Sequence, residues 1–374
     1  MLVAAASETH SPYWNFPEMA FLSRQKNAIG LDIGSSSVKV LELEQTKSGT
    51  YRLLHFGMTR LPPEAIVDGA VMNTAAVVDA IRELLNREKI KSRDVVASVA
   101  GHSVIIKRIN LPVMTPEELD ESIQWEAEQY IPFDVNDVNI DVQILDATGD
   151  EAGQMEVLLV AARKELVNEY VSIIHEAGLV ASVVDVDAFA VANSFELNYK
   201  QPLGTIALIN VGAATTNIIV LREGATAFTR DISMGGRQVT EEIQRALNIS
   251  FEEAESMKVG RDDRDASAVV PEEVERVIRG VGDSIATEIH RSLDFYLSTA
   301  TGDGLSRIYL SGGGALTPGL GSALSKVTGT PIETIDPFRN IEIDERSFNP
   351  RFLQDAASQA AVVVGLALRR PGDR

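Results

Sequence analysis

The chain has 374 residues, of which 45% are hydrophobic and 24% charged, and its formal net charge is −20. A chain of this length and apolar content predicts two domains or one bilobed body. The acidity argues against nucleic acid or an anionic bilayer as a ligand, because their phosphate groups require a cationic surface. The absence of cysteine excludes disulfides, thiolate metal sites and cysteine nucleophiles, and it fits a cytoplasmic protein.

The N-terminal stretch, residues 1–26, is predicted to be a disordered extension. It lacks the basic and apolar regions of a signal peptide, and regular patterning begins only near Met19. No apolar run in the chain has the length of a membrane span. We therefore expect the protein to reach a membrane only through a partner.

The stretch AIGLDIGSSSVKV at 28–40 predicts a β-hairpin with a polar tip, because apolar residues alternate on both sides of a Gly/Ser turn. Gly34 permits close backbone approach, and Ser35, Ser36 and Ser37 offer amides and hydroxyls that can hold a phosphate. Asp32, just before the turn, suits a hydrated Mg²⁺ that bridges to a nucleotide. On this stretch alone, an ordinary hairpin is an equally good interpretation.

A compact β-α-β-β-α module is predicted at about 104–180, inserted in the first lobe. Its first helix begins with a capping box, formed by Thr115 at the N-cap and Glu118 three residues later, with Pro116 between them. This local signal predicts where the helix starts.

Aromatic side chains lie on or just after that helix, at Trp125, Tyr130 and Phe133. Packing in the core of the module is one interpretation of these residues. The other is a groove for a partner peptide, because aromatics on a small inserted module suit an interface.

A second hairpin repeats the first about 180 residues later, in the run IALINVGAATTNIIVL at 206–221. Both segments contain an apolar strand, an Asp or Asn, a glycine two residues later, a small or hydroxyl-bearing turn and a second apolar strand. Two such hairpins, each opening a lobe, can grip one phosphate chain between them. The repeat is much more specific than either loop alone.

Two more glycine-rich loops follow. Gly235 and Gly236 precede a predicted helix at 237–247, whose N-terminus favours an anion. The triple glycine at 312–314 follows a short strand and leaves a flat backbone surface that a base or ribose can approach closely. An apolar, alanine-rich terminal helix is predicted at 352–369.

These segments in this order resemble the actin-like ATPase superfamily, which includes actin, heat-shock chaperone ATPases, sugar kinases and the bacterial division protein FtsA. Within it, the chain most resembles the PilM family of cytoplasmic type IV pilus assembly proteins over about 27–370. The segments that carry the resemblance are NAIGLDIGSSSVKV, LDESIQWEAEQYIPF, and RSLDFYLSTA followed by IYLSGGGALTPGL.

The resemblance implies an α/β, bilobed actin-like ATPase fold of two ribonuclease-H-like lobes. An FtsA-like β-α-β-β-α subdomain is inserted in the first lobe. The implied boundaries are 27–103 and 181–203 for the first lobe, 104–180 for the insertion and 204–374 for the second lobe, with its helical nucleotide-side subdomain at about 237–307.

The resemblance also implies ATP and Mg²⁺ as ligands. The residues that match the family's nucleotide motifs are Asp32, Gly34, Ser35, Ser36, Ser37 and Lys39 at the first phosphate motif, Asn210, Gly212, Ala213, Thr215 and Thr216 at the second, Gly235 and Gly236 before the nucleotide-facing helix, Gly312, Gly313 and Gly314 at the adenosine motif, and Glu255, Lys258, Arg291 and Ser292 beside the base. Asp32 is the implied Mg²⁺ residue, acting through water.

PilM-like proteins bind the cytoplasmic N-terminal peptide of PilN, a membrane-anchored protein, between the inserted module and its parent lobe. The resemblance therefore implies a cytoplasmic platform, peripheral at the inner membrane through PilN and in contact with other pilus inner-membrane and motor components. The expected partner-binding residues are Trp125, Tyr130, Pro132 and Phe133. The resemblance leaves open whether the protein forms a homo-oligomer.

One position departs from the superfamily pattern: Asn210 stands where an Asp is usual. An amide can hold a water, but it cannot act as a general base or supply charge to Mg²⁺. The sequence therefore predicts ATP binding with little or no hydrolysis. The alternatives are an active FtsA-like or MreB-like ATPase that forms filaments, and a small-molecule kinase of the same fold. The end of the chain, without an amphipathic membrane helix, favours PilM over FtsA.

Overall fold

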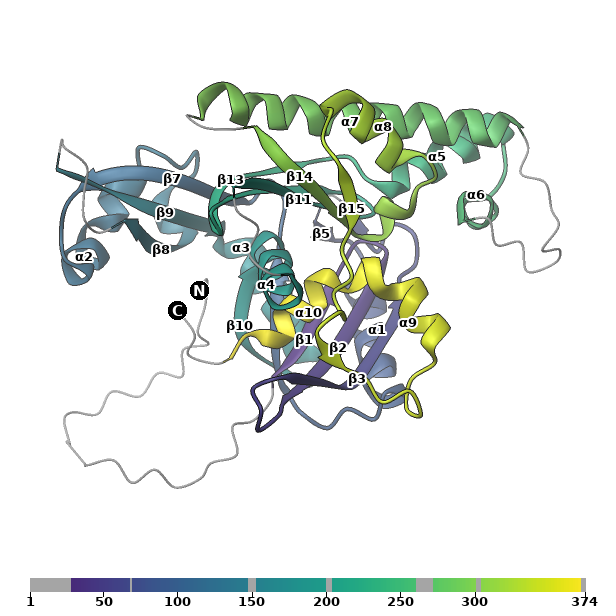
Figure 1. The fold of residues 1–374 in the computed structure, drawn as a ribbon. Helices are drawn as coiled ribbons and strands as arrows, with labels where there is room; N and C mark the ends of the chain where they lie inside the picture. Colours follow the sequence, from purple (N-terminus) through teal and green to yellow (C-terminus); the bar gives the residue numbers. More distant parts are fainter. Residues whose placement is uncertain are drawn as a thin grey trace.

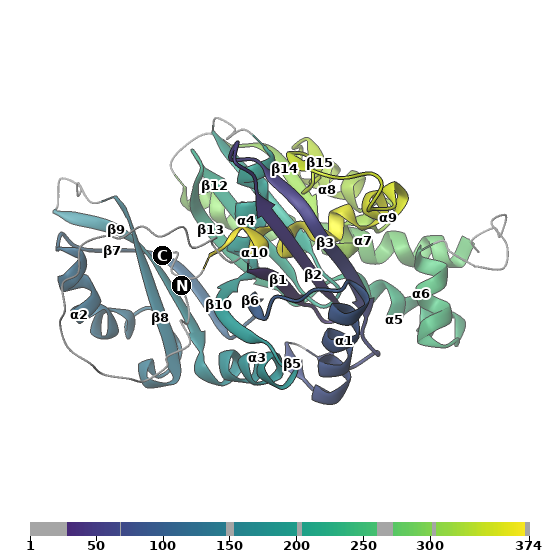
Figure 2. The same cartoon turned by 90° about the horizontal axis from the view of Figure 1, so that it is seen from below.

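A computed structural model describes residues 28–67, 69–146, 153–199, 204–259, 272–300 and 304–370 of the protein. The predicted N-terminal extension at 1–26 lies outside the described residues. Two sheets form the body of the molecule, and a third lies in the inserted module at one end (Figures 1 and 2).

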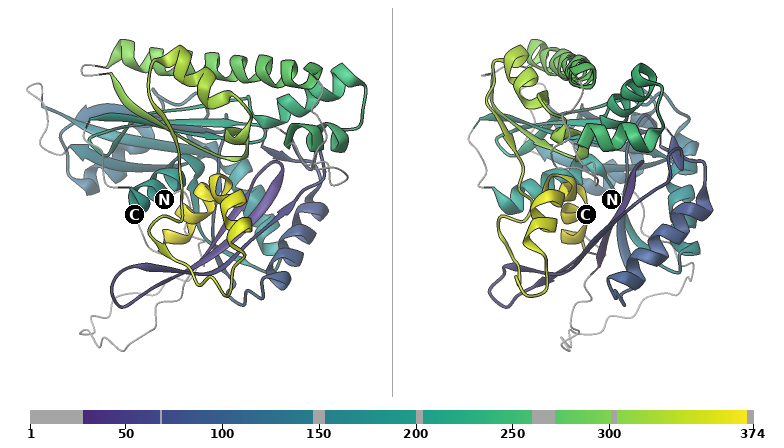
Figure 3. Two further views of the ribbon diagram at one scale, coloured as in Figure 1. Left: turned by 45° about the vertical axis from the view of Figure 1, so that its right-hand side comes forward. Right: turned by 90° about the vertical axis from the view of Figure 1, so that its right-hand side faces the viewer.

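The first sheet has the strand order β10-β6-β1-β2-β3-β16. Its strands are β1 (Ile29–Ile33), β2 (Ser37–Gln45), β3 (Tyr51–Arg60), β6 (Asp94–Val99), β10 (Val180–Val186) and β16 (Ile341–Glu342). Helix α1 (Thr74–Arg87) packs on one face, and α10 (Ala361–Leu368) packs on the other beside α4 (Asp187–Asn198) (Figure 3). A two-stranded ribbon, β4 (Ile66–Val67) and β5 (Ala70–Val71), lies beside this lobe.

The second sheet has the order β13-β12-β11-β14-β15. Its strands are β11 (Thr205–Val211), β12 (Thr216–Arg222), β13 (Ala225–Ile232), β14 (Leu305–Ser311) and β15 (Ile332–Thr334). Helices α7 (Glu272–Thr299) and α8 (Leu320–Thr328) cover its outer face, and α4 contacts β11 and β12 (Figure 1). Helix α4 therefore touches both lobes.

A small helical core sits at one end of the second lobe. It is formed by α5 (Gly236–Leu247), α6 (Phe251–Val259) and the first turns of α7, through Val239, Ile243, Ala254, Val274 and Ile278. The later turns of α7, including Ile289, pack on the second sheet instead.

The inserted module has a three-stranded antiparallel sheet in the order β7-β9-β8. Its elements are β7 (Val104–Pro112), α2 (Pro116–Ala127), the 3₁₀ helix η1 (Val135–Asp137), β8 (Val138–Asp146) and β9 (Gln154–Arg163). The capping box is present as predicted: the amide of Glu118 donates to Thr115 Oγ1 at 3.2 Å, and the amide of Thr115 donates to Glu118 Oε2 at 2.8 Å. Alternate residues of β9 face α2 and the first lobe.

Two predicted boundaries differ from the structure. Helix α3 (Lys164–Glu176), assigned to the insertion, packs against α1 and β10 in the first lobe, because its apolar stripe fits that core. The chain beyond Phe338, assigned to the second lobe, returns to the first, where β16 pairs with β3. The predicted terminal helix at 352–369 is broken into α9 (Pro350–Ala356), the 3₁₀ helix η3 (Ala357–Ala360) and α10.

Candidate nucleotide site

The first hairpin has the predicted geometry. Strands β1 and β2 pair from Ile29↔Glu42 to Ile33↔Val38, and the Gly34 amide donates to the carbonyl of Ser37 at 3.1 Å. Asp32 and Lys39 are cross-strand partners, so their side chains meet on one face, where Lys39 Nζ lies 2.8 Å from Asp32 Oδ2. The carboxylate is therefore held at the base of the turn by a buried ion pair.

The second hairpin repeats this arrangement. The Gly212 amide donates to the carbonyl of Thr215 at 2.9 Å, as Gly34 does to Ser37. Asn210 and Asn217 are the cross-strand pair, in the places of Asp32 and Lys39. The internal repeat in the sequence therefore corresponds to two hairpins with the same hydrogen-bonded turn.

The triple glycine forms the 3₁₀ helix η2 (Gly313–Leu316) at the end of β14. Gly312 has φ of 88°, which L side chains rarely adopt, and a Cβ there would overlap the carbonyl of Val211. A Cβ on Gly236 would lie 3.2 Å from Gly314 Cα. The absence of side chains thus lets three loops approach one another around a single space.

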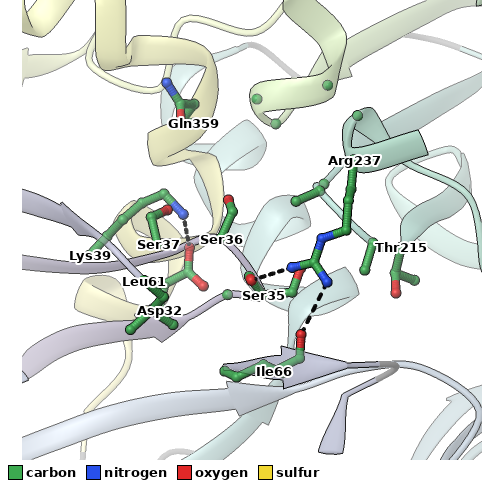
Figure 4. A pocket seen from close by; sticks show the side chains of 18 of the residues that line it. Asp32, Ser35, Ser36, Ser37, Lys39, Leu61, Ile66, Thr215, Arg237 and Gln359 are labelled. Carbon is green, nitrogen blue, oxygen red and sulfur yellow. Dashed lines mark hydrogen bonds and ion pairs between the residues drawn. The ribbon is translucent and has the colours of Figure 1, made fainter. Parts of the chain in front are cut away.

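That space is a cavity of about 980 Å³ between the two lobes. Figure 4 shows the first hairpin with Asp32, Ser37 and Lys39 on the left and Thr215 and Arg237 on the right. The predicted residues that line it are Asp32, Gly34, Ser35, Ser36, Ser37, Lys39, Asn210, Gly212, Ala213, Thr215, Gly236, Glu255, Lys258, Gly312, Gly313 and Gly314.

Four predicted residues do not line the cavity. Thr216 is fully buried and its hydroxyl donates to the carbonyl of Met234 at 2.7 Å, while Gly235 packs against the carbonyls of the second turn. On α7, the Arg291 guanidinium binds Glu288 Oε1 at 2.6 Å at the surface, and Ser292 is buried and bonded within its own helix. The family resemblance implied that these four residues belong to the nucleotide site, whereas the structure places them outside the lining of the cavity.

Glu255 and Lys258 do come to the cavity wall, as an ion pair. Lys258 Nζ lies 2.6 Å from Glu255 Oε2 and also donates to the carbonyl of Gly236 at 3.2 Å. Thr240 Oγ1 donates to the same Glu255 oxygen at 2.5 Å. The pair thus fastens α6 to the first turn of α5.

Arg237 is a cavity residue that the sequence did not single out. It belongs to α5 in the second lobe, but its guanidinium donates to the carbonyl of Ser35 at 2.6 Å and to that of Ile66 at 3.3 Å, both in the first lobe (Figure 4). These acceptors are neutral carbonyls, so the positive charge remains available to a phosphate at the serine turn.

Asp187 is a second residue that the sequence did not single out. It begins α4, accepts a 2.6 Å hydrogen bond from Ser98 Oγ and lines the same cavity as Asp32. Burial, followed by the charge of Asp32, raises the pKa of the Asp187 carboxyl from 3.8 to about 7. Only the fold could identify it, because 155 positions separate it from Asp32.

Asp32 and Asp187 together suit a hydrated Mg²⁺. The two carboxylates repel each other in one cavity, and a bound cation would relieve that repulsion. Mg²⁺ in proteins usually keeps several water ligands and binds one or two carboxylates together with phosphate oxygens. Among the described residues, no group of three or more His, Cys, Asp or Glu side chains could hold a metal ion by itself. The donor set therefore fits a metal that arrives with phosphates.

The predicted partner residues occupy different environments. Trp125 is 74% exposed on α2, and Pro132 is also exposed. Tyr130 and Phe133 are half-buried against the core of the module, with the Arg163 guanidinium over the Phe133 ring. Helix α2 lies on the face of the module sheet opposite the first lobe, so Trp125 does not face the expected groove (Figure 2).

In the part of the chain that the structure describes, no helix combines the length and the apolar character needed to cross a membrane. Two lobes that face each other across a cleft, each with a glycine-turn hairpin at the opening, define the actin-like ATPase class. FtsA proteins, members of this class, match along the sequence.

The particular family follows from a closer match. The model of the type IV pilus assembly protein PilM matches residues 30–371, so the chain belongs to the PilM family. The solved structure of a PilM-PilN type IV pilus biogenesis complex contains a chain that is 30% identical, with a TM-score of 0.82, covering 93% of this chain and 100% of that one.

FtsA of Neisseria meningitidis serogroup B is 24% identical over 361 residues, 86% of each chain. FtsA of Bacillus subtilis is 25% identical over 254 residues, 62% of this chain. The matched part spans 57% of the length of the Bacillus protein.

Proposed function

We propose that this chain is an ATP-binding scaffold of the type IV pilus assembly machinery, with little or no hydrolysis. The observation that carries the proposal is the interlobe cavity, in which both hairpin turns and the triple glycine meet. Consecutive turn amides and a nearby guanidinium suit a phosphate chain, and the glycines suit a base or ribose. The pilus part of the proposal is supported by the match to the PilM family.

The side chain at 210 supports slow turnover. The Asn210 amide accepts from Ser311 Oγ at 3.3 Å and donates to Asn217 Oδ1 at 3.0 Å, so it is engaged as a neutral group. It cannot take a proton from an attacking water. Bound ATP then stabilises the protein as a structural ligand that joins the lobes.

Asp187 favours a second candidate, an active ATPase of the FtsA or MreB kind. A carboxyl with a pKa of about 7 in the cavity can act as a general base near neutral pH. Bound Mg²⁺ would lower that pKa and leave the carboxylate as a ligand instead.

Two measurements on the purified protein test the two candidates. The first is anion-exchange chromatography of the nucleotide that the protein releases, and the second is ATP turnover in excess Mg-ATP. We expect co-purified ATP and negligible ADP release. Steady ADP release that Asp187→Asn abolishes would instead establish the ATPase. The absence of any nucleotide affinity would contradict both.

We also propose that the N-terminal peptide of PilN binds the face of the module sheet that looks toward the first lobe. Arg108 and Glu156 form an ion pair there, and the Arg108 Nε atom is buried without a hydrogen-bond partner among the described residues. A donor of this kind can pair with the backbone of a bound peptide. Such a contact would hold the protein in the cytoplasm at the inner membrane, where it meets the other pilus components.

Fluorescence anisotropy with a labelled peptide of the cytoplasmic segment of PilN tests the binding face. Arg108→Ala should weaken binding by at least about tenfold, since it removes charge-assisted contacts. Trp125→Ala should change it less than about twofold, because Trp125 lies on the opposite side of the sheet. The reverse pattern would move the site to the outer face of α2, where Trp125 is exposed.

A further inference from the structure

A row of polar side chains crosses four neighbouring strands of the second sheet. Ser311, Asn210, Asn217 and Asp231 occupy facing positions on β14, β11, β12 and β13. The first three are buried, with exposures of 0%, 7% and 3%. Asn210, Asn217 and Asp231 also line the interlobe cavity. Strand register alone therefore aligns these groups along the floor of the site.

The hydrogen bonds in the row all run in one direction. Ser311 Oγ donates to Asn210 Oδ1, Asn210 Nδ2 donates to Asn217 Oδ1 at 3.0 Å, and Asn217 Nδ2 donates to Asp231 Oδ1 at 2.9 Å. Asp231 accepts only, so its carboxylate fixes the orientation of both amides. In this orientation one N–H of Asn210 has no partner among the described residues, and such a donor suits an anionic ligand better than a carboxylate at this position would.

The other oxygen of Asp231 reaches across to the first lobe. It accepts the backbone amide of Gly101 at 2.7 Å, and next to it His102 Nε2 and Ser233 Oγ are 2.6 Å apart. Gly101 and His102 form the turn that leads from β6 into β7, the first strand of the inserted module. The row thus ends at the root of the module.

We propose that Asp231 is a positioning residue that makes the floor of the nucleotide site and the root of the inserted module one hydrogen-bonded unit. Through Asn217 it turns the N–H of Asn210 toward the cavity, and through the Gly101 amide it holds the start of β7. The binding of a phosphate to Asn210 is then transmitted through these hydrogen bonds to the root of the module. This last step rests on the proposed nucleotide binding; the chain of bonds does not.

Placing a carboxylate at position 210 tests the direction of the hydrogen bonds in the row. In Asn210→Asp, residue 210 can only accept, so Asn217 must turn its N–H groups toward it and present Oδ1 to the Asp231 carboxylate. That contact is repulsive, and Asp231 loses its donor. Adding Asp231→Asn restores the two bonds of Asn217 in the opposite direction: the new amide at position 231 donates to Asn217, which donates to the new carboxylate at position 210. The Gly101 amide and the Ser311 hydroxyl remain donors, as in the wild type. The double variant keeps the net charge of the wild type.

Hydrogen exchange measured by mass spectrometry over 99–112, on the full chain without nucleotide, is the readout. We expect N210D to speed exchange at the Gly101 turn by at least about tenfold, because Asp231 without its Asn217 donor no longer holds the Gly101 amide in place. N210D/D231N should return it to within about threefold of wild type. Asn86→Asp, the same change on the exposed surface of α1, serves as the control and should leave exchange unchanged. A change that is merely structural would not be rescued by a second substitution two strands away.

The proposal is overturned if N210D leaves exchange at 99–112 unchanged, or if the double variant is no better protected than N210D. The same samples are then measured with Mg-ATP, which should slow exchange at 99–112 in the wild type and not in N210D. Isothermal titration with Mg-ATP is run alongside. Wild-type protein that does not bind Mg-ATP contradicts the proposed function, whereas the rescue experiment without nucleotide still decides the role of Asp231.

Discussion

At the scale of single residues, the site depends on how carboxylates are paired. Asp32 has Lys39 as its ion-pair partner, whereas the hydrogen-bond partner of Asp187 is the neutral hydroxyl of Ser98. Burial and the charge of Asp32 therefore raise the pKa of Asp187 to about 7. The folded protein holds this proton up to about pH 7 and the unfolded chain only up to about pH 3.8, so the carboxyl lowers the folding stability as the pH rises through that interval.

Asp187→Asn should stabilise the protein increasingly as the pH rises. The unfolded carboxyl loses its proton near its ordinary pKa of 3.8 and the folded one near 7, so the stability of the wild type falls across that interval and is level above it. We expect the variant to gain more than about 1 kcal/mol at pH 8 and almost nothing at pH 4, since one pKa unit corresponds to about 1.4 kcal/mol. Urea unfolding at pH 4 to 8 measures the difference.

Asp79→Asn, the same change at an exposed position on the surface of α1, provides the control for this comparison. An Asp187→Asn gain that is equal at pH 4 and pH 8 would contradict the assigned pKa.

At the scale of elements, close helix crossings position the lobes. Helix α10 lies against α4, and a Cβ on Gly365 would overlap the carbonyl of Ala190. Gly30 in β1 likewise faces the backbone of α10 at Val363. These glycines let the C-terminal segment pack directly on β1, the strand that precedes the turn of the first hairpin.

Gly365→Ala should destabilise the protein by more than about 2 kcal/mol, because overpacking against backbone cannot be relieved by a side-chain rotation. Gly280→Ala in α7 is the matched control: nothing lies within 4 Å of its added Cβ, so alanine should stabilise that helix by up to about 1 kcal/mol. Thermal unfolding of both variants gives the sign and size of each effect. If the two variants changed the stability equally, helices α4 and α10 would be able to move apart and accommodate the added methyl group.

At the scale of the whole molecule, side-chain hydrogen bonds that join the two lobes contribute to the state of the cleft. Arg237 spans it on one side through the carbonyls of Ser35 and Ile66, and the Asp231–Gly101 bond spans it by the module. Charge-assisted hydrogen bonds of this kind contribute about 1.5–3 kcal/mol each. Closure is thus sensitive to single side chains.

Arg237→Ala should open the cleft and weaken Mg-ATP binding together. Small-angle X-ray scattering should report a larger radius of gyration without nucleotide, and the affinity should fall by at least about tenfold, since the phosphate also loses a guanidinium. Arg237→Lys keeps the charge but cannot donate to both carbonyls, so it should recover part of the affinity and little of the closure. An unchanged scattering profile in Arg237→Ala would show that other contacts keep the lobes together.

The sequence by itself determined what depends on neighbours along the chain. Strand alternation and a glycine turn predict both hairpins, and the Thr115 capping box predicts the start of α2. The resemblance to a family motif marks Asn210 as a departure, again within one short segment. Each of these features is satisfied within one hairpin or one helix turn.

Only the tertiary structure decided which distant segments meet. It brought Asp187 beside Asp32, joined Asp231 to Gly101, returned the chain beyond Phe338 to the first lobe, and turned Arg291 and Ser292 away from the cavity. Such contacts depend on how apolar faces pack and on where two lobes close, and one stretch of sequence fits many partners equally well. The pattern therefore predicted the glycine-rich loops that meet at the cavity, and packing decided which charges surround that cavity.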